Sequence, residues 1–306
     1  MFDYVPDWAQ RFDFKSHSPS GCGRPDDLEF FEKCYARPHG MWWPGNAAMA
    51  GGRAAETAVN LHTVHNEPWA NAFRSALAEF DEHESPAHVA NDADKHALIR
   101  DMVYTVPLTK AEKEAGAAEI SGTPFELVCQ NLRDGTLEAT KGVNKIDDGR
   151  WVSMQFDGVE LDFIGQMDLE ANAVVELKTS WPSPADTKAG YRMPSLPSQP
   201  RPEHVMQTAL YRAWLHRQEQ IVPVKLIYAT PRGYRVFDSE TCDALSDLSM
   251  SRALEKMCRI ARSREHLLKR AENLDDLFQF MSPDFGNFMW RDKPPKYLDA
   301  ARRIFK

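Results

Sequence analysis

The most informative hydrophobic pattern lies near the middle of the chain. Val159 to Met167 is apolar and β-prone, a polar break follows, and Ala173 to Leu177 is apolar again, which predicts a β-hairpin. If its turn is centred on Asn172, antiparallel pairing places Asp168 directly opposite Glu176, with Cβ atoms roughly 5 Å apart. The pattern therefore predicts a pair of neighbouring carboxylates.

The rest of the chain alternates between helical and β patterns. Helices are expected at 28–36, 47–62, 69–84, 89–106, 124–132, 203–217 and 239–270, with short helices in the tail at 275–280 and 297–305. Strands are expected at 137–143, 151–156, 159–167, 173–179, 222–230 and 234–237. Residues 2–24 lack periodicity and are expected to be a loop or a loosely docked arm. The predicted fold class is α/β, a central mixed β-sheet flanked by helices, with N-terminal and C-terminal helical extensions.

The segment 181–202 contains six prolines and the basic residues Lys188, Arg192 and Arg201. A loop of this length inside a compact domain is usually functional or disordered. It connects the strand that carries Lys178 to the next helix. Two interpretations stay open, a lid or strand guide over the site and plain disorder.

The side chains around the predicted hairpin favour a particular chemistry. Lys178 lies two positions after Glu176 and so points to the same face of the sheet. Two adjacent carboxylates repel, and one must take up a proton unless a cation is bound. Mg²⁺ prefers oxygen ligands, commonly one or two carboxylates plus a substrate phosphate, and a metal acidifies bound water. Asp168, Glu176 and Lys178 therefore outline a phosphodiester hydrolysis site, the alternative being a solvated hairpin face with a cross-strand ion pair.

The helix expected at 203–217 adds polar side chains to this hypothesis. His204, Gln207 and Tyr211 are spaced at i, i+3 and i+7, which places them on one helical face. Three motifs then follow one another in the chain. They are Gly165-x-x-Asp168, Glu176-x-Lys178-Thr179-Ser180 and Gln207-x-x-x-Tyr211. In this order the motifs resemble the RecB-like exonuclease branch of the PD-(D/E)XK nuclease superfamily, which includes phage exonucleases and the mitochondrial genome maintenance exonuclease.

The resemblance covers roughly residues 28–237 and implies a restriction-endonuclease-like core. It implies that Asp168 and Glu176 bind one or two Mg²⁺ or Mn²⁺ ions and that Lys178 assists the attacking water. It assigns Gln207 and Tyr211 to support of the site and of the DNA. The predicted arrangement is an N-terminal helical part at 1–135 that contributes a helix to the site, the core sheet and motif helix at 136–238, and a C-terminal helical extension at 239–306, integrated into one domain.

The family also has an earlier helix with a glycine followed four residues later by a metal ligand. Gly52 and Glu56 fit that element, so the resemblance implies that Glu56 completes the metal shell; an exposed helix glutamate is the alternative. Several members hold an iron-sulfur cluster with four cysteines. The five cysteines here do not have that spacing, and no cluster is expected.

Charge distribution bears on a DNA partner. The net charge of −8 counts against general affinity for polyanions, but residues 251–306 carry 13 Lys and Arg against 8 Asp and Glu, whereas the rest carries 24 against 37. Such asymmetry can mark a nucleic-acid face. Candidate DNA contacts, each of which is alternatively an ordinary core or solvated residue, are Trp42, Trp43, Lys188, Arg192, Arg201, Arg252, Lys256 and Arg259.

The composition restricts the remaining classes. The chain is 42% hydrophobic and 27% charged, as in soluble globular proteins, and no apolar run approaches the roughly 18 residues of a membrane span. No signal-peptide pattern begins the sequence, so a cytoplasmic protein is expected, in a host cell if a phage encodes it. The predicted function is metal-dependent DNA hydrolysis, with exonuclease action implied by the resemblance. The alternatives are a structure-selective or site-specific endonuclease and a non-catalytic DNA-binding protein of the same fold.

Overall fold

A five-stranded mixed sheet forms the centre of the computed structural model, which describes residues 5–41, 43 and 45–305. The strand order is β11-β10-β7-β6-β3. The strands are β3 (Asp147–Asp148), β6 (Leu169–Glu170), β7 (Val174–Thr179), β10 (Val224–Thr230) and β11 (Gly233–Asp238). β7 and β10 pair in parallel, and the other neighbours pair antiparallel. This arrangement confirms the mixed α/β class predicted from the sequence.

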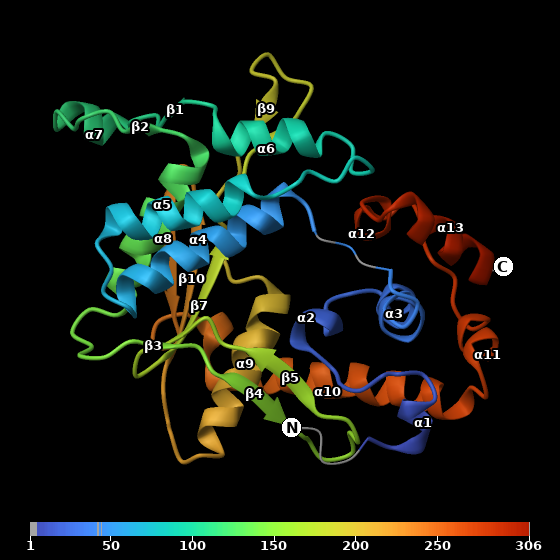
Figure 1. The fold of residues 1–306 in the computed structure, drawn as a ribbon. Coiled ribbons are helices and arrows are strands. Elements are labelled where there is room, and N and C mark those ends of the chain that lie inside the picture. Colours follow the sequence, from blue (N-terminus) through green and yellow to red (C-terminus); the bar gives the residue numbers. More distant parts are fainter. Residues whose placement is uncertain (1–4, 42, 44, 306) are drawn as a thin grey trace.

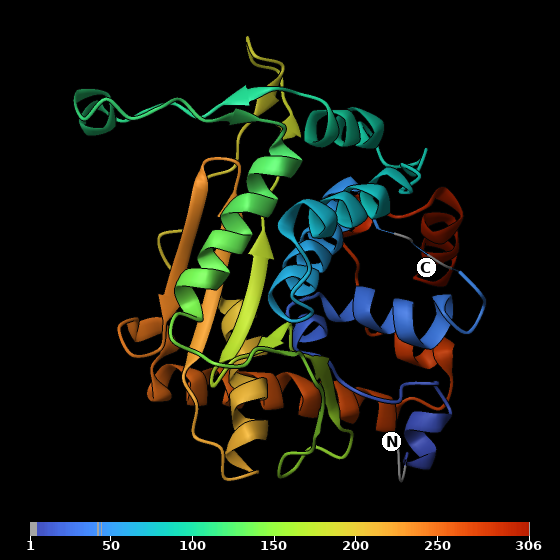
Figure 2. The same cartoon turned by 60° about the vertical axis from the view of Figure 1, so that its left-hand side comes forward.

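Helices cover both faces of this sheet (Figures 1 and 2). On one face lie α4 (Ala47–Thr63), α5 (Trp69–Asp81) and α8 (Pro124–Ala139), and on the other lie α9 (Pro202–His216) and α10 (Asp247–Arg270). Each face of the sheet has its own hydrophobic core. Val175 and Leu177 of β7 pack in the core with α4, α5 and α8, whereas Val174 packs in the core with α9 and α10, because successive residues of a strand point to opposite faces. The helix α9 connects the parallel strands β7 and β10, as a parallel pair requires.

The two ends of the chain share a third core, and the N-terminal and C-terminal helices lie side by side in Figures 1 and 2. Its elements are the C-terminal end of α10 together with α1 (Asp7–Gln10), α3 (Asp26–Phe30), the π-helical turn η1 (Phe31–Ala36), α11 (Leu274–Phe278), α12 (Phe288–Arg291) and α13 (Pro295–Ile304). Phe12 and Phe14 are buried in this core, and α2 (Pro19–Cys22) follows them. The prediction of a loop or loosely docked arm was therefore wrong for the described residues 5–24, because aromatic side chains anchor a segment that lacks periodicity.

The strand predicted at 137–143 was also wrong, because α8 continues through Gly135 to Ala139. A Cβ at Gly135 would lie 2.8 Å from Ile227 Cγ2 and 2.9 Å from Tyr234 Cδ2. The glycine thus lets the helix approach β10 and β11 closely, and this packing outweighs the unfavourable helix propensity of glycine. In the sequence the same glycine resembled the end of a helix.

The strands predicted at 151–156 and 159–167 form a separate hairpin. β4 (Trp151–Met154) pairs with β5 (Phe163–Gln166) in a two-stranded ribbon outside the central sheet. β3, before this ribbon, and β6, after it, belong to the central sheet and pair with each other. The N-terminal segment reaches this ribbon through a bridge between His17 and Phe163. The expectation of one continuous strand series therefore requires correction.

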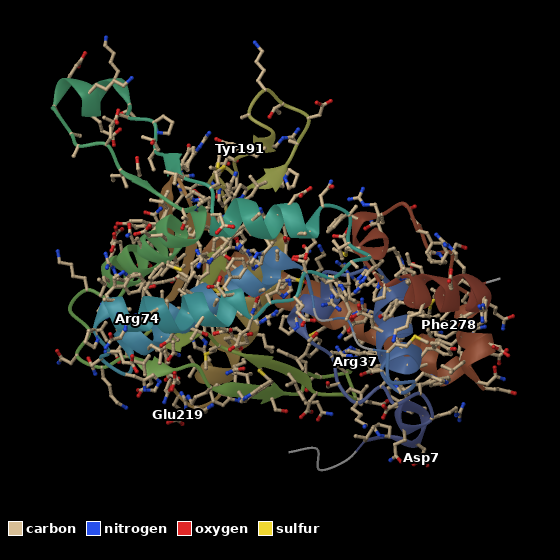
Figure 3. The ribbon with its side chains drawn as sticks, turned by 45° about the horizontal axis from the view of Figure 1, so that its top comes forward. Asp7, Arg37, Arg74, Tyr191, Glu219 and Phe278 are labelled. Atoms are coloured by element: carbon tan, nitrogen blue, oxygen red, sulfur yellow. The ribbon has the colours of Figure 1, made fainter. Side chains whose placement is uncertain are left out.

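The remaining elements lie around these layers. They are α6 (Asp92–Arg100), β1 (Tyr104–Thr105), α7 (Lys110–Glu114), β2 (Ser121–Gly122), β8 (Ser183–Pro184), β9 (Tyr191–Arg192) and η2 (Asp243–Leu245). β1, α7 and β2 project as an arm in Figure 2. Part of the proline-rich segment forms the β8–β9 hairpin, and Tyr191 lies at the base of this projection in Figure 3. Across residues 5–41, 43 and 45–305, no helix has both the length and the apolar character that a membrane crossing needs.

Candidate active site

The hairpin formed by β6 and β7 has the register that the sequence predicts. The observed pairs are Leu169 with Val175 and Glu170 with Val174. The same register places Asp168 opposite Glu176. Asn172 occupies the turn with a φ of 52°, a left-handed conformation in which asparagine is enriched. The Asp168 carboxylate accepts a hydrogen bond from the Leu177 backbone N–H at 2.7 Å, which fixes it against β7.

Glu176 is fully buried. Glutamate side chains are ordinarily charged at neutral pH and are almost never fully buried unless paired. Its Oε1 accepts a hydrogen bond from Lys178 Nζ at 2.5 Å. Its Oε2 has no hydrogen-bond partner among the described residues and is shielded from solvent. A buried carboxylate oxygen without a partner loses its hydration without compensation. Glu176 is therefore an unsatisfied group at the centre of the fold.

Helix α4 brings Glu56 to the hairpin by a close approach at two glycines. A Cβ at Gly52 would lie 3.1 Å from Thr179 Oγ1, and one at Gly51 would lie 3.1 Å from the Trp181 ring. Larger residues would push the helix away from the end of β7. Glu56 follows Gly52 by about one helical turn and lines the same cavities as Lys178 and Asp168.

The pKa values of the three carboxyl groups of this site, those of Glu56, Asp168 and Glu176, are all raised. Burial raises the pKa of Glu56 to about 8, and the charge of Asp168 adds to the rise. Burial also raises the pKa of Asp168 and, together with the Asp168 charge, that of Glu176. Burial would lower the pKa of Lys178, but Glu176 and Asp168 outweigh it and raise the pKa. The site therefore has more negative charge than its lysine can compensate.

From α9, Gln207 and Tyr211 hold the end of β5, two residues before Asp168. The Tyr211 hydroxyl donates to the backbone carbonyl of Gln166 at 2.7 Å, and Gln207 Nε2 donates to the same hydroxyl at 3.0 Å. The Tyr211 ring occupies the space that a side chain at Gly165 would need, since a Cβ there would lie 2.7 Å from Tyr211 Cε1. This packing explains why a glycine stands three residues before Asp168.

His204, on the same face of α9, contacts a tyrosine that the sequence did not point to. Its Nδ1 lies 2.7 Å from the Tyr228 hydroxyl, which also accepts from the backbone N–H of Arg201 at 3.0 Å. Tyr228 of β10 pairs with Lys178 of β7. Burial lowers the pKa of His204 to about 3, assisted by the charges of Lys178 and Arg201, so this histidine is neutral near pH 7.

Two cavities meet at Glu56. The larger, about 940 Å³, is here termed the basic cleft, because the described residues lining it include six Lys or Arg against the two carboxylates of Glu56 and Asp292. The smaller, about 500 Å³, is termed the acidic pocket and is lined by Glu56, Asp168 and Glu79 together with Arg53. Lys178 lies in the basic cleft and Asp168 in the acidic pocket. Glu56, Asp168 and Lys178 thus line two cavities that share Glu56. Glu176, Gln207 and Tyr211 line neither of them.

The predicted DNA contacts separate into two groups. Trp43, Arg192 and Arg201 line the basic cleft. The others do not: Lys188 is exposed in the β8–β9 hairpin, and Arg252, Lys256 and Arg259 lie on the exposed face of α10. Trp42 lies outside the described residues.

Several cleft residues were not singled out from the sequence. Four separate elements or loops supply them, and all line the basic cleft: Arg24, Lys95, Phe288, and both Met49 and Arg53 of α4. No local pattern distinguishes them from ordinary surface residues. The adjacent glycines of α4 were the one usable signal, since they indicated a close approach to the sheet and hence that Arg53 lies near the site.

The carboxylates of the site are of the kind that can serve as ligands to a metal ion. Among the described residues, no group of three or more His, Cys, Asp and Glu side chains is spaced to hold a metal as it stands, and Lys178 contacts Glu176. The chemistry of the donors nevertheless suits a hard cation, which takes carboxylate oxygens. Glu176 Oε2 has no partner, and the pKa values of all three carboxyl groups are raised. A bound cation would compensate the negative charge of these carboxylates and give the Glu176 oxygen a partner.

Comparison with known proteins adds no family assignment: no protein-family model matches this chain, and no curated protein matches it.

Proposed function

We propose that this protein is a metal-dependent DNA nuclease. The observation that carries the proposal is the uncompensated carboxylate cluster, in which a buried Glu176 oxygen has no partner. Glu56 and Lys178 of the same cluster line a cleft rich in cations. A phosphodiester carries negative charge and is attracted to such a cleft. Clefts that contain titratable groups with strongly perturbed pKa values are functional-site candidates.

The chain's residues divide the work as follows. Asp168, Glu176 and Glu56 would hold one or two Mg²⁺ or Mn²⁺ ions, which supply a Lewis acid and an acidified water. Lys178, whose raised pKa keeps it protonated, orients the water and offsets charge that develops on the phosphate oxygens. Gln207 and Tyr211 hold the end of β5, and with it the segment that leads to Asp168, through the Gln166 carbonyl.

Action on DNA ends is proposed from the resemblance to exonucleases. An endonuclease on the same core is the alternative within enzymes, and a covalently closed circular DNA separates the two. An exonuclease leaves the circle intact while degrading the same molecule after linearisation. An endonuclease cleaves the circle.

The test is hydrolysis of end-labelled single-stranded and double-stranded DNA with Mg²⁺, Mn²⁺ or EDTA. We expect metal-dependent release of nucleotides or short fragments by wild type and a loss of at least about 100-fold in Lys178→Ala, because an oriented cation at the reacting phosphate is lost. Lys225→Ala is the matched control, since Lys225 lies on the neighbouring strand and pairs with Asp238 at 3.2 Å. It should retain the wild-type rate.

The non-catalytic alternative makes a different prediction. If pure wild-type protein binds DNA but hydrolyses neither substrate with either metal, the nuclease proposal is wrong and a DNA-binding protein of this fold replaces it. If Lys178→Ala and Lys225→Ala lose equal activity, the assignment of the site is wrong.

A further inference from the structure

The basic cleft contains apolar side chains where a simple phosphate-binding groove would need none. Phe288 of α12 is 58% exposed and Met49 of α4 is 42% exposed, and both line the cleft together with Trp43. Exposing large apolar side chains to water is unfavourable. Such residues beside cations indicate a ligand that has apolar faces as well as negative charge.

The Trp43 ring is held in place from the side of the C-terminal segment. Lys293 Nζ lies 3.8 Å from the centre of the ring, and Lys293 is itself buried and ion-paired with Glu32. Two segments far apart in the sequence therefore fix this aromatic side chain in the wall of the cleft. A fixed ring loses less conformational freedom when a ligand stacks on it.

The cations of the cleft are spread around these apolar groups. They come from the N-terminal segment (Arg24), α4 (Arg53), α6 (Lys95), β7 (Lys178), β9 (Arg192) and the residue before α9 (Arg201). Proteins that bind single-stranded nucleic acid combine a positively charged groove with side chains on which bases stack. In a duplex the bases are paired and stacked on one another, and the grooves present only their edges.

We propose that the substrate of this site is an unpaired DNA strand, which enters the basic cleft with its phosphates on the cations and its bases against Phe288, Met49 and Trp43. This inference rests on the proposed function for the reaction, but it makes a separate statement about binding. In blunt duplex DNA each base is covered by its stacked neighbours, except on the outer face of the terminal pair at each end. The protein therefore prefers single-stranded DNA or the unpaired tail of a duplex.

The experiment measures binding without hydrolysis. Fluorescence anisotropy in EDTA compares a labelled single-stranded oligonucleotide with the blunt duplex of the same sequence, for wild type and for Phe288→Ala, Met49→Ala and Phe280→Ala. Phe280 is the matched control, because it is 55% exposed but does not line the cleft. Thermal unfolding verifies that each variant is folded.

We expect wild type to bind the single strand at least about tenfold more tightly than the duplex. Phe288→Ala should weaken single-strand binding by about fivefold or more, the lower end of the effect of losing one stacked base. Met49→Ala should weaken it less, and Phe280→Ala should not change it. Equal affinity for the two DNA forms, or equal effects of Phe288→Ala and Phe280→Ala, would overturn the proposal.

Hydrolysis in Mg²⁺ separates this inference from the proposed function. If the single-strand preference and the Phe288 effect are present but no DNA is hydrolysed, the binding inference holds and the nuclease proposal fails. If blunt duplex is degraded as fast as single-stranded DNA in a Lys178-dependent way, the nuclease proposal holds and the single-strand inference fails.

Discussion

Two clusters of buried charge in this protein respond to burial in opposite ways. The terminal cluster joins the two ends of the chain: Lys33 pairs with Glu29 at 2.9 Å, Arg24 pairs with Glu32 at 2.5 Å, and Lys293 also pairs with Glu32. The site cluster consists of Glu56, Asp168, Glu176 and Lys178. The terminal cluster has three cations for two carboxylates, whereas the site cluster has three carboxylates around one lysine.

The pKa values follow this difference. Burial alone would raise the pKa of Glu29, but the charges of Lys33, Arg264 and Arg24 outweigh it and lower the pKa. In the site cluster burial prevails, and the pKa of Glu56 rises to about 8. Burial therefore does not by itself distinguish a structural ion pair from a site. The number of compensating cations does, because a carboxylate without one needs a proton or a bound cation.

The largest expected effect is on hydrolysis. Glu176→Gln keeps the shape of the side chain but removes its charge, so the DNA cleavage rate should fall by about 10³-fold, or about 4 kcal/mol. The free energy of unfolding should not fall, because the amide relieves repulsion from Asp168. Cleavage assays and urea unfolding measure the two quantities.

Glu170→Gln is the matched control for this prediction, since Glu170 lies on β6 and pairs with Arg150 at 2.7 Å. Its cleavage rate should remain that of wild type. A Glu176→Gln variant that cleaves DNA as fast as this control would contradict the role of the site cluster.

The next largest expected effect is a loss of protein stability when the terminal cluster loses one of its cations. Lys293→Met should lower the free energy of unfolding by about 3 kcal/mol, because it removes one partner of a buried ion pair. Urea unfolding measures the change. Lys296→Met is the control, since Lys296 is exposed on α13 and should change stability little. Equal stability of the two variants would show that the terminal cluster does not hold the chain ends together.

A metal ion should stabilise the folded protein by binding to the site cluster and not to the terminal cluster. Mg²⁺ at about 100 times its dissociation constant should add about 2.7 kcal/mol to the free energy of unfolding, and EDTA should reverse the gain. Asp168→Ala should lose most of it, whereas Glu29→Gln, in the terminal cluster, should keep it. Thermal melts with and without Mg²⁺ provide the measurement, and an equal gain in both variants would place the metal elsewhere.

The smallest expected effect is the contribution of Glu29 to the loss of stability at acidic pH. Because its folded pKa is lowered, Glu29 contributes stability above the unfolded pKa of about 4.3, and this contribution is lost as the pH falls through the folded pKa. Glu29→Gln should therefore lose less stability than wild type on acidification. Melting temperatures between neutral and acidic pH test this, with the exposed Glu82→Gln expected to behave as wild type.

Much of the site could be predicted from the sequence because its geometry is local. A turn at Asn172 and the alternation of a β-strand are sufficient to place Asp168 opposite Glu176. Helical spacing placed Gln207 and Tyr211 on one face in the same way. The strand predicted after Gly135 failed for the opposite reason, because contacts with Ile227 and Tyr234, distant in the chain, decide that the helix continues.

By itself, the sequence determined the carboxylate pair, its neighbouring lysine and the supporting helix, since each depends on backbone periodicity over a few residues. Only the tertiary structure decided that Glu176 is buried, that Glu56 lies beside the hairpin and that a basic cleft forms. The lining of this cleft comes from the N-terminal segment, α4, α6, β7, β9, the residue before α9 and α12. Burial and electrostatic compensation depend on everything that packs around a group, and the packing partners here are up to hundreds of residues apart in the chain.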